Sequence, residues 1–283
     1  MSPLSRRRFL LATAATGAGL ALAELPRGAA AGQETPPAAL LPEDFPRQDA
    51  DAVRETVGAS HSNLDRVKEL VTARPALAKC AWDWGFGDWE TPLGAASHTG
   101  RRQIAEFLMS QGARPDLFTF AMLGNRAVIE AAVRASPGIQ GVRGPHGITL
   151  LQHAKNRLSA EDLDPSESDG LNGVVEYLNA VGGADAAETD LEMDKAQKLV
   201  FVGSYGIGAP GAADTIEVAL NKREILTISR GKRSERNLRH VEPNTFAPVG
   251  APDVRIRFEV AGGKAVSLTI HDPMPVATAF ASP

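Results

Sequence analysis

Apolar positions between residues 51 and 186 recur at the spacing of amphipathic helices, and the pattern repeats along the chain. Val67, Leu70 and Val71 form an i, i+3, i+4 stripe, and residues 104–108 repeat it as Ile, Phe and Leu. The preceding segments also match, because residues 59–63 are ASHSN and residues 96–100 are ASHTG. A compressed third copy begins near Ala121, and a fourth begins near Gly147 and resumes at Val174 after an acidic insertion. A repeat of about 33 residues with paired short helices predicts a stack of helix pairs.

The second copy contains the most specific motif. Thr91-Pro92-Leu93-Gly94-Ala95-Ala96, followed by Gly100 and Gly112-Ala113, resembles an ankyrin repeat in which Gly94 replaces the usual histidine. The resemblance covers about residues 51–186 and implies a solenoid of about three to four repeats over residues 47–190. Physically, Thr91 can cap the first helix and Pro92 suits its first turn. Gly100 and Gly112 fall where a positive φ is expected.

After Asp190 the pattern changes to alternation, and the charge changes with it. Residues 32–193 carry a net charge of -10, whereas residues 194–283 carry +3, which marks a domain boundary. Six strands are predicted, at residues 199–205, 215–220, 224–229, 238–241, 254–260 and 265–270. Such strands in residues 194–283 close most economically into a small antiparallel barrel or a sandwich. The fold class is therefore α+β in separate domains, and the spacing in the second domain is similar to a lipocalin-like β domain, a similarity that carries over no site.

The N-terminus has the features of an export signal. Ser5-Arg6-Arg7-Arg8-Phe9-Leu10 precedes a short apolar stretch and resembles the signal of the twin-arginine (Tat) route. Residues 1–31 are predicted to be this signal peptide, with cleavage after Ala23 or Ala31, and residues 32–46 are a proline-rich linker. The resemblance implies a periplasmic or secreted protein that meets the Tat export machinery transiently and keeps no membrane span after signal removal.

Charge and cysteine content exclude several classes of protein. The net charge is -4, and residues 1–31 contribute +3 of it, so the remaining chain carries -7. A protein this acidic is a poor general binder of nucleic acid. The single cysteine, Cys80, excludes an intrachain disulfide and a multi-thiolate metal site.

No catalytic motif stands out. The sequence holds no G-x-S-x-G elbow, H-E-x-x-H helix, Walker loop or dinucleotide fingerprint. The six histidines are scattered, and His61 and His98 occupy equivalent repeat positions where a structural hydrogen bond explains both. The prediction is a non-catalytic protein without metal or cofactor.

The candidate binding site is the aromatic segment that joins the first two copies. Rigid aromatic surface dominates interaction hot spots, so a protein partner is expected here, although the rings could instead seal the join between repeats or dock the β domain. Two alternative ligands are a carbohydrate or cell-wall fragment stacked on the tryptophans, and a small apolar ligand inside the β domain. The candidate residues are Trp82, Asp83, Trp84, Phe86, Asp88 and Trp89.

Overall fold

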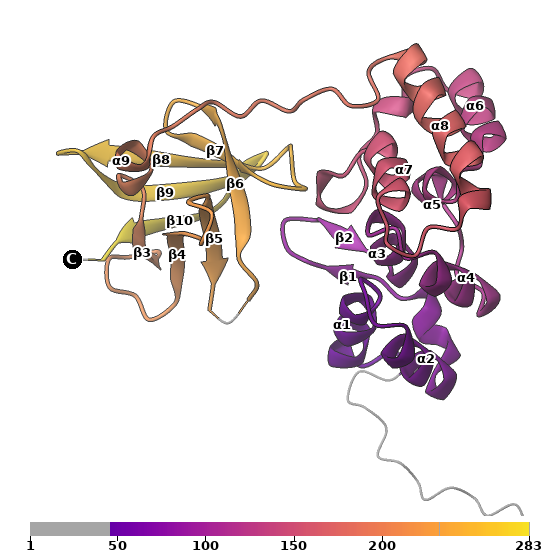
Figure 1. The fold of residues 1–283 in the computed structure, drawn as a ribbon. Coiled ribbons are helices and arrows are strands. Elements are labelled where there is room, and N and C mark those ends of the chain that lie inside the picture. Colours follow the sequence, from indigo (N-terminus) through magenta and orange to yellow (C-terminus); the bar gives the residue numbers. More distant parts are fainter. Residues whose placement is uncertain (1–45, 232, 283) are drawn as a thin grey trace, which may run out of the picture. The chain divides into compact units, whose positions relative to one another are not determined.

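The computed structural model describes residues 46–231 and 233–282. The predicted signal peptide and most of the predicted linker lie outside these residues. Helices come first and a closed antiparallel β-barrel follows (Figure 1). None of the described helices is long and apolar enough to cross a membrane.

The helical part consists of short helices joined by tight turns and one small hairpin. Its α-helices, in chain order, are α1 (Ala50–Ala59), α2 (Leu64–Ala73), α3 (Pro92–His98), α4 (Arg102–Ser110), α5 (Leu117–Met122), α6 (Arg126–Ala135), α7 (Leu150–Leu158) and α8 (Ser168–Val181). Single turns of 3-10 helix are η1 (Pro75–Lys79), η2 (Ile139–Gly141), η3 (Pro145–Gly147) and η4 (Pro165–Glu167). Strands β1 (Trp82–Asp83) and β2 (Trp89–Glu90) pair antiparallel between η1 and α3.

Successive helix pairs lie side by side. Helix α1 packs on α3, α3 on α5 and α5 on α7, while α2 packs on α4 and α6 on α8. The expected cap is present, since the Thr91 hydroxyl accepts from the Gly94 N–H at 2.9 Å. Thr149, for which no cap is predicted, caps α7 in the same way. Gly100 and Gly112 have φ of 68° and 87°, as predicted. Ala95 and Ala96 are fully buried, which lets the neighbouring helices approach closely.

The barrel is built from eight strands among the described residues, each paired antiparallel with its neighbours. They are β3 (Gly203–Ile207), β4 (Thr215–Leu220), β5 (Leu226–Arg230), β6 (Arg236–Glu242), β7 (Thr245–Pro248), β8 (Arg255–Ala261), β9 (Lys264–Asp272) and β10 (Met274–Ala281). The strands pair in chain order, and β10 closes the barrel against β3. Aromatic side chains fill the interior, where Phe201 stacks edge-on against Phe246 and Phe258. The sequence left barrel and sandwich open, and the structure is a barrel.

The strand predictions need three corrections. The strand expected at 199–205 begins at Gly203, because Asp194 and Gln197 form a capping box that starts helix α9 (Lys195–Leu199). Strands β7 and β10 were not predicted at all. Strand β10 holds Pro275 and a register shift between Pro275 and Ala277, which hide its alternation. By contrast, the hairpin of β8 and β9 forms as predicted, with Ala261 opposite Lys264.

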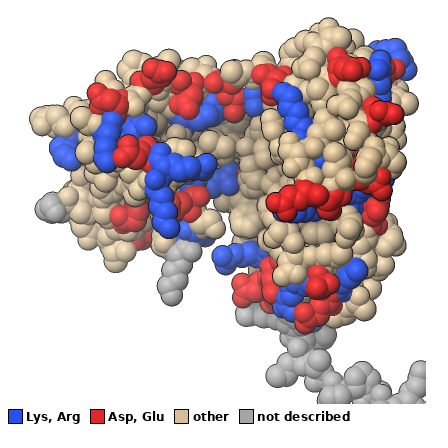
Figure 2. All heavy atoms as spheres, viewed as in Figure 1, with Lys and Arg blue, Asp and Glu red and all other residues tan. Residues whose placement is uncertain are grey.

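Surface charge is mixed on the face drawn in Figure 2. Acidic and basic side chains both occur on the helical part and on the barrel. The basic groups on that face lie among acidic ones, which is unlike the continuous basic surface that binds a phosphate backbone.

Candidate metal centre

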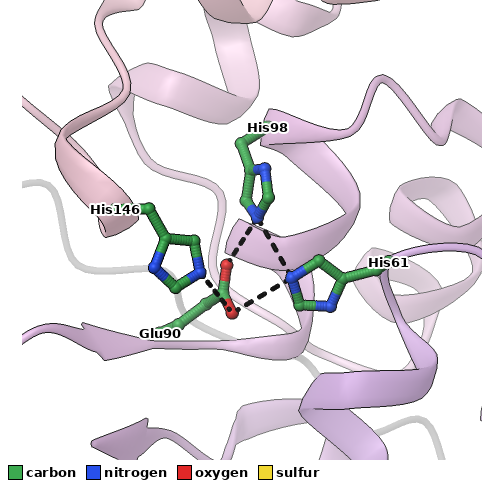
Figure 3. A group of neighbouring side chains, drawn as sticks. All are labelled: His61, Glu90, His98 and His146. Carbon is green, nitrogen blue, oxygen red and sulfur yellow. Dashed lines mark hydrogen bonds and ion pairs between the residues drawn. The ribbon is translucent and has the colours of Figure 1, made fainter. Parts of the chain in front are cut away.

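Three histidines that are far apart in the sequence meet around one glutamate. The side chains of His61, His98 and His146 point at the Glu90 carboxylate (Figure 3). One ligand atom from each of the four residues lies within 4.8 Å of every other. A cluster of three imidazoles and one carboxylate is a typical donor set for a divalent transition metal.

Glu90 is the buried residue at the centre of the cluster. It ends β2, directly before the α3 cap Thr91, and its side chain is fully buried. Burial alone would raise the pKa of Glu90, but the favourable interactions of its carboxylate with the His146 and His98 rings outweigh it and lower the pKa to about 2. The Trp84 indole N–H donates to Oε2 at 2.8 Å. Oε1 lies 2.8 Å from His98 Nε2 but accepts no hydrogen bond of good geometry from any described residue.

His61 is oriented by the end of helix α1. Its Nδ1 lies 3.1 Å from the carbonyl oxygens of Val57 and Gly58. A carbonyl can only accept a hydrogen bond, so Nδ1 carries the proton and the neutral ring has its lone pair on Nε2. That Nε2 faces the cluster, 3.5 Å from Glu90 Oε2. The expected structural hydrogen bond is present, and it also aims His61 as a ligand.

His98 is the last residue of α3 and sits beside His61. The two Nε2 atoms are 3.2 Å apart, and the rings are nearly perpendicular. Stacking α1 on α3 places these equivalent repeat positions side by side. Only 8% of the His98 side chain is exposed, against 29% for His61.

His146 reaches the cluster from η3, the turn that precedes α7. Its backbone has φ of 60°, a left-handed conformation that is uncommon for a residue with a side chain. The Asp88 carboxylate holds this turn, because Oδ1 accepts from the His146 backbone N–H at 2.9 Å and Oδ2 lies 2.8 Å from Nδ1. Nε2 is left facing Glu90 Oε2 at 3.5 Å. A carboxylate on the outer nitrogen of a metal-binding histidine is a recurrent arrangement in metal sites.

The electrostatics of His146 follow from these two carboxylates. Burial would lower its pKa, but the hydrogen bonds with Asp88 and Glu90 prevail and raise the pKa to about 9. The pKa of Asp88 is lowered against the effect of its burial, mainly by its hydrogen bonds from His146. Without a metal ion, the His146 ring is therefore protonated on both nitrogens at neutral pH, and this cation is paired with the two carboxylates.

Several separations between donor atoms are close to those around a small tetrahedral ion. Metal–nitrogen bonds of about 2.0–2.1 Å at tetrahedral angles separate neighbouring ligand atoms by about 3.3 Å. The separations in the cluster are 3.2 Å between the two Nε2 atoms of His61 and His98, and 2.8 to 3.5 Å between the Glu90 oxygens and the three rings. Cys80 takes no part: it packs with the first helices, and burial raises the pKa of its thiol to about 11.

The aromatic segment named from the sequence divides between this cluster and the surface. Trp84 and Asp88 serve the cluster, through Glu90 and His146 respectively. Trp82 is half-buried against the first helices, and the Asp83 carboxylate accepts from the Gly85 N–H at 2.7 Å within the turn. Phe86 lies in neither place: it sits at the turn with φ of 59° and packs against the barrel core. Trp89 points outward with 62% of its surface exposed, opposite in direction to Glu90 beside it.

In the sequence the histidines are scattered, and no local pattern predicts a functional role for Glu90. One available signal was the equivalence of His61 and His98, because stacked repeats bring equivalent positions together. Nothing in the local pattern signals His146, whose approach depends on a left-handed turn held by Asp88.

Comparison with known proteins gives no relative. No protein-family model matches the chain, and neither the curated proteins nor the solved structures contain a significant match.

Proposed function

We propose that this protein binds a divalent transition-metal ion through His61, Glu90, His98 and His146. The observation that carries the proposal is the convergence of three Nε2 atoms on one buried carboxylate. In two of the rings the Nδ1 atom is engaged by a hydrogen-bond acceptor, which leaves Nε2 to face the centre. Glu90 Oε1 supports the same conclusion, because it is buried and lies 2.8 Å from His98 Nε2 without accepting a hydrogen bond of good geometry.

The donor set indicates which ion is bound. Imidazole and carboxylate suit Zn²⁺, Co²⁺, Ni²⁺ and Cu²⁺, while the absence of sulfur among the four donors disfavours Cu⁺. A tetrahedral spacing favours Zn²⁺ and its spectroscopic substitute Co²⁺. Two carboxylates near His146 attract the cation, and the ion takes the place of the His146 proton.

Metal titration of the full-length chain tests this function. After removal of metal by a chelator, Zn²⁺ binding is measured by calorimetry and Co²⁺ binding by its visible absorption. One tight site per chain is expected, with the intense visible bands of tetrahedral Co²⁺. His61→Ala, His98→Ala and Glu90→Gln should each weaken binding strongly. His271→Ala, on barrel strand β9, is the control that should bind as the wild type does. Equal affinity in all variants, or no binding, would refute the proposal.

A second function is supported by Trp89. An indole with 62% of its surface exposed is costly to leave in water, and such side chains anchor protein interfaces. We therefore also propose that the helical part, as an ankyrin-like repeat array, holds a protein partner through this face. Trp89→Ala should abolish capture of a periplasmic partner without changing the circular dichroism spectrum.

We also propose that the protein is exported from the cytoplasm. Its support is the segment Ser5–Leu10, which resembles a twin-arginine signal and lies outside the described residues. Mass spectrometry of the exported protein should find a start near Glu24 or Gly32. Recovery of full-length chain from the cytosol alone would contradict export.

A further inference from the structure

The four candidate ligands come from four separate segments of the helical part. His61 follows α1, Glu90 ends the β1–β2 hairpin, His98 ends α3, and His146 lies in the turn before α7. The pair α5–α6 lies between α4 and that turn in the chain. An ion held by all four would therefore connect the first helix pair, the second, and the start of the fourth.

Two of the joined segments are less buried than α3, since α1 buries only three of its ten residues, Val53, Thr56 and Val57. None of residues 134–148 is buried, so the segment that carries His146 depends on polar contacts. Helix α1 is the first described helix and packs against α2 and α3. In stacked arrays each unit is stabilised mainly by its neighbours, so a terminal unit and an exposed connection open most easily.

The other two segments are firmly packed. Every residue of α3 is buried, and the Glu90 side chain is fully buried beside it. An ion bound to Glu90 and His98 would thus be fixed to a rigid base. His61 and His146 would bring the two weakly held segments onto that base.

We propose that the bound metal ion is a structural cross-link, which holds α1 and the segment 134–148 onto α3 and the hairpin. The proposal depends on the proposed metal binding and adds its role. Four protein donors complete a tetrahedral set, as in structural zinc sites, whereas catalytic sites keep one position for water. The left-handed backbone at His146, which costs free energy, is compensated when its ring coordinates the ion.

Hydrogen exchange of the full-length chain, with and without Zn²⁺, tests the cross-link. At a free Zn²⁺ concentration about 100 times Kd, the amides of α1 and of residues 134–148 should exchange about 100-fold more slowly than in the metal-free protein. Barrel amides outside β6, whose Arg236 is paired with Asp88, should not change. Each histidine variant should also lose protection in only one of the two segments. Zn²⁺-loaded His146→Ala should protect α1 but not 134–148, and loaded His61→Ala should protect 134–148 but not α1.

The outcomes separate this role from metal binding itself. Each variant is first shown by calorimetry to be loaded with Zn²⁺ at the concentration used, with His271→Ala as the control. If the wild type binds Zn²⁺ and exchange in both segments is unchanged, the cross-link is wrong and the proposed function stands. If the wild type binds no Zn²⁺, both proposals fail. If either variant fails to fold, the wild-type comparison still decides.

Discussion

His61 and His98 are 37 residues apart in the sequence, and their Nε2 atoms lie 3.2 Å apart. Two neutral imidazoles cannot both direct lone pairs at each other at this distance without repulsion. Either a proton or a cation lies between them, and the Glu90 carboxylate touches both rings. The contact follows from the stacking of α1 on α3.

The Glu90 carboxylate should contribute more to metal affinity than a supporting residue does. Glu90→Gln keeps the size of the side chain but removes the negative charge that faces all three rings. Loss of an outer-shell partner typically weakens metal binding about 10–100-fold, so loss of this ligand should exceed that. Calorimetry with Zn²⁺ measures the change. A Glu90→Gln protein that binds Zn²⁺ within a few fold of the wild type would show that the carboxylate is not a ligand.

Metal binding should release a proton at neutral pH. His146 has a pKa of about 9 in the metal-free protein, so its ring is protonated at pH 7 and must lose the proton to coordinate. Apparent affinity should therefore rise about tenfold per pH unit below pH 9 and level off above it. Calorimetry in buffers of different ionisation enthalpy counts the protons released. No released proton at pH 7 would mean that His146 stays outside the coordination sphere.

His153 should make the fold sensitive to mild acid. It is fully buried in α7, and burial lowers its pKa to about 4 despite the hydrogen bond to the Thr149 carbonyl. The unfolded chain takes up the proton near pH 6.5, so stability is complete above that pH and is lost as pH falls towards 4.

The loss of stability that is due to His153 can be measured by comparison with His153→Leu. Between pH 7.5 and 5 the metal-free wild type should lose about 2 kcal/mol more stability than His153→Leu, by urea unfolding. Comparing the pH change within each protein removes the constant cost of the substitution. Equal losses in the two proteins would show that His153 is not buried in its neutral form.

Arg157 should be among the most important side chains for stability. Its side chain is 2% exposed and bonds Glu167, the Asp162 carboxylate and the Gly100 carbonyl, at 2.6 to 3.0 Å. Arg157→Met removes the donor to the Gly100 carbonyl and leaves Glu167 with the partly exposed Arg102 as its ion-pair partner. It should cost about 3–5 kcal/mol of unfolding free energy. The matched control is Arg126→Met, where the exposed pair with Glu130 should cost less than about 1 kcal/mol. Similar losses in both variants would contradict this assignment.

The sequence was sufficient for features set by local pattern. The helix cap at Thr91, the positive φ of Gly100 and the β8–β9 hairpin all follow from residue type and short-range spacing. The strand pattern predicted a small closed or layered β domain. It could not choose between these, because closure depends on β10, whose Pro275 and small residues carry little alternation.

The candidate centre was beyond local reasoning for a physical reason. Its four donors are joined by tertiary packing, and each has an ordinary role in its own segment: His61 at a helix end, Glu90 before a cap, His146 in a turn. Only the equivalence of His61 and His98 in the repeat pointed towards a contact. The turn that aims His146 is set by Asp88, 58 residues earlier, and no short-range pattern encodes it.

X-ray absorption at the zinc edge, on the full-length chain loaded with one equivalent of Zn²⁺, decides whether these side chains form a metal centre. We expect a four-coordinate ion with three imidazole nitrogens and one carboxylate oxygen at about 2.0–2.1 Å. In His98→Ala one imidazole should disappear from the spectrum. A spectrum dominated by water oxygens, or one that is the same in His98→Ala and the wild type, would show that these four side chains do not form a metal centre.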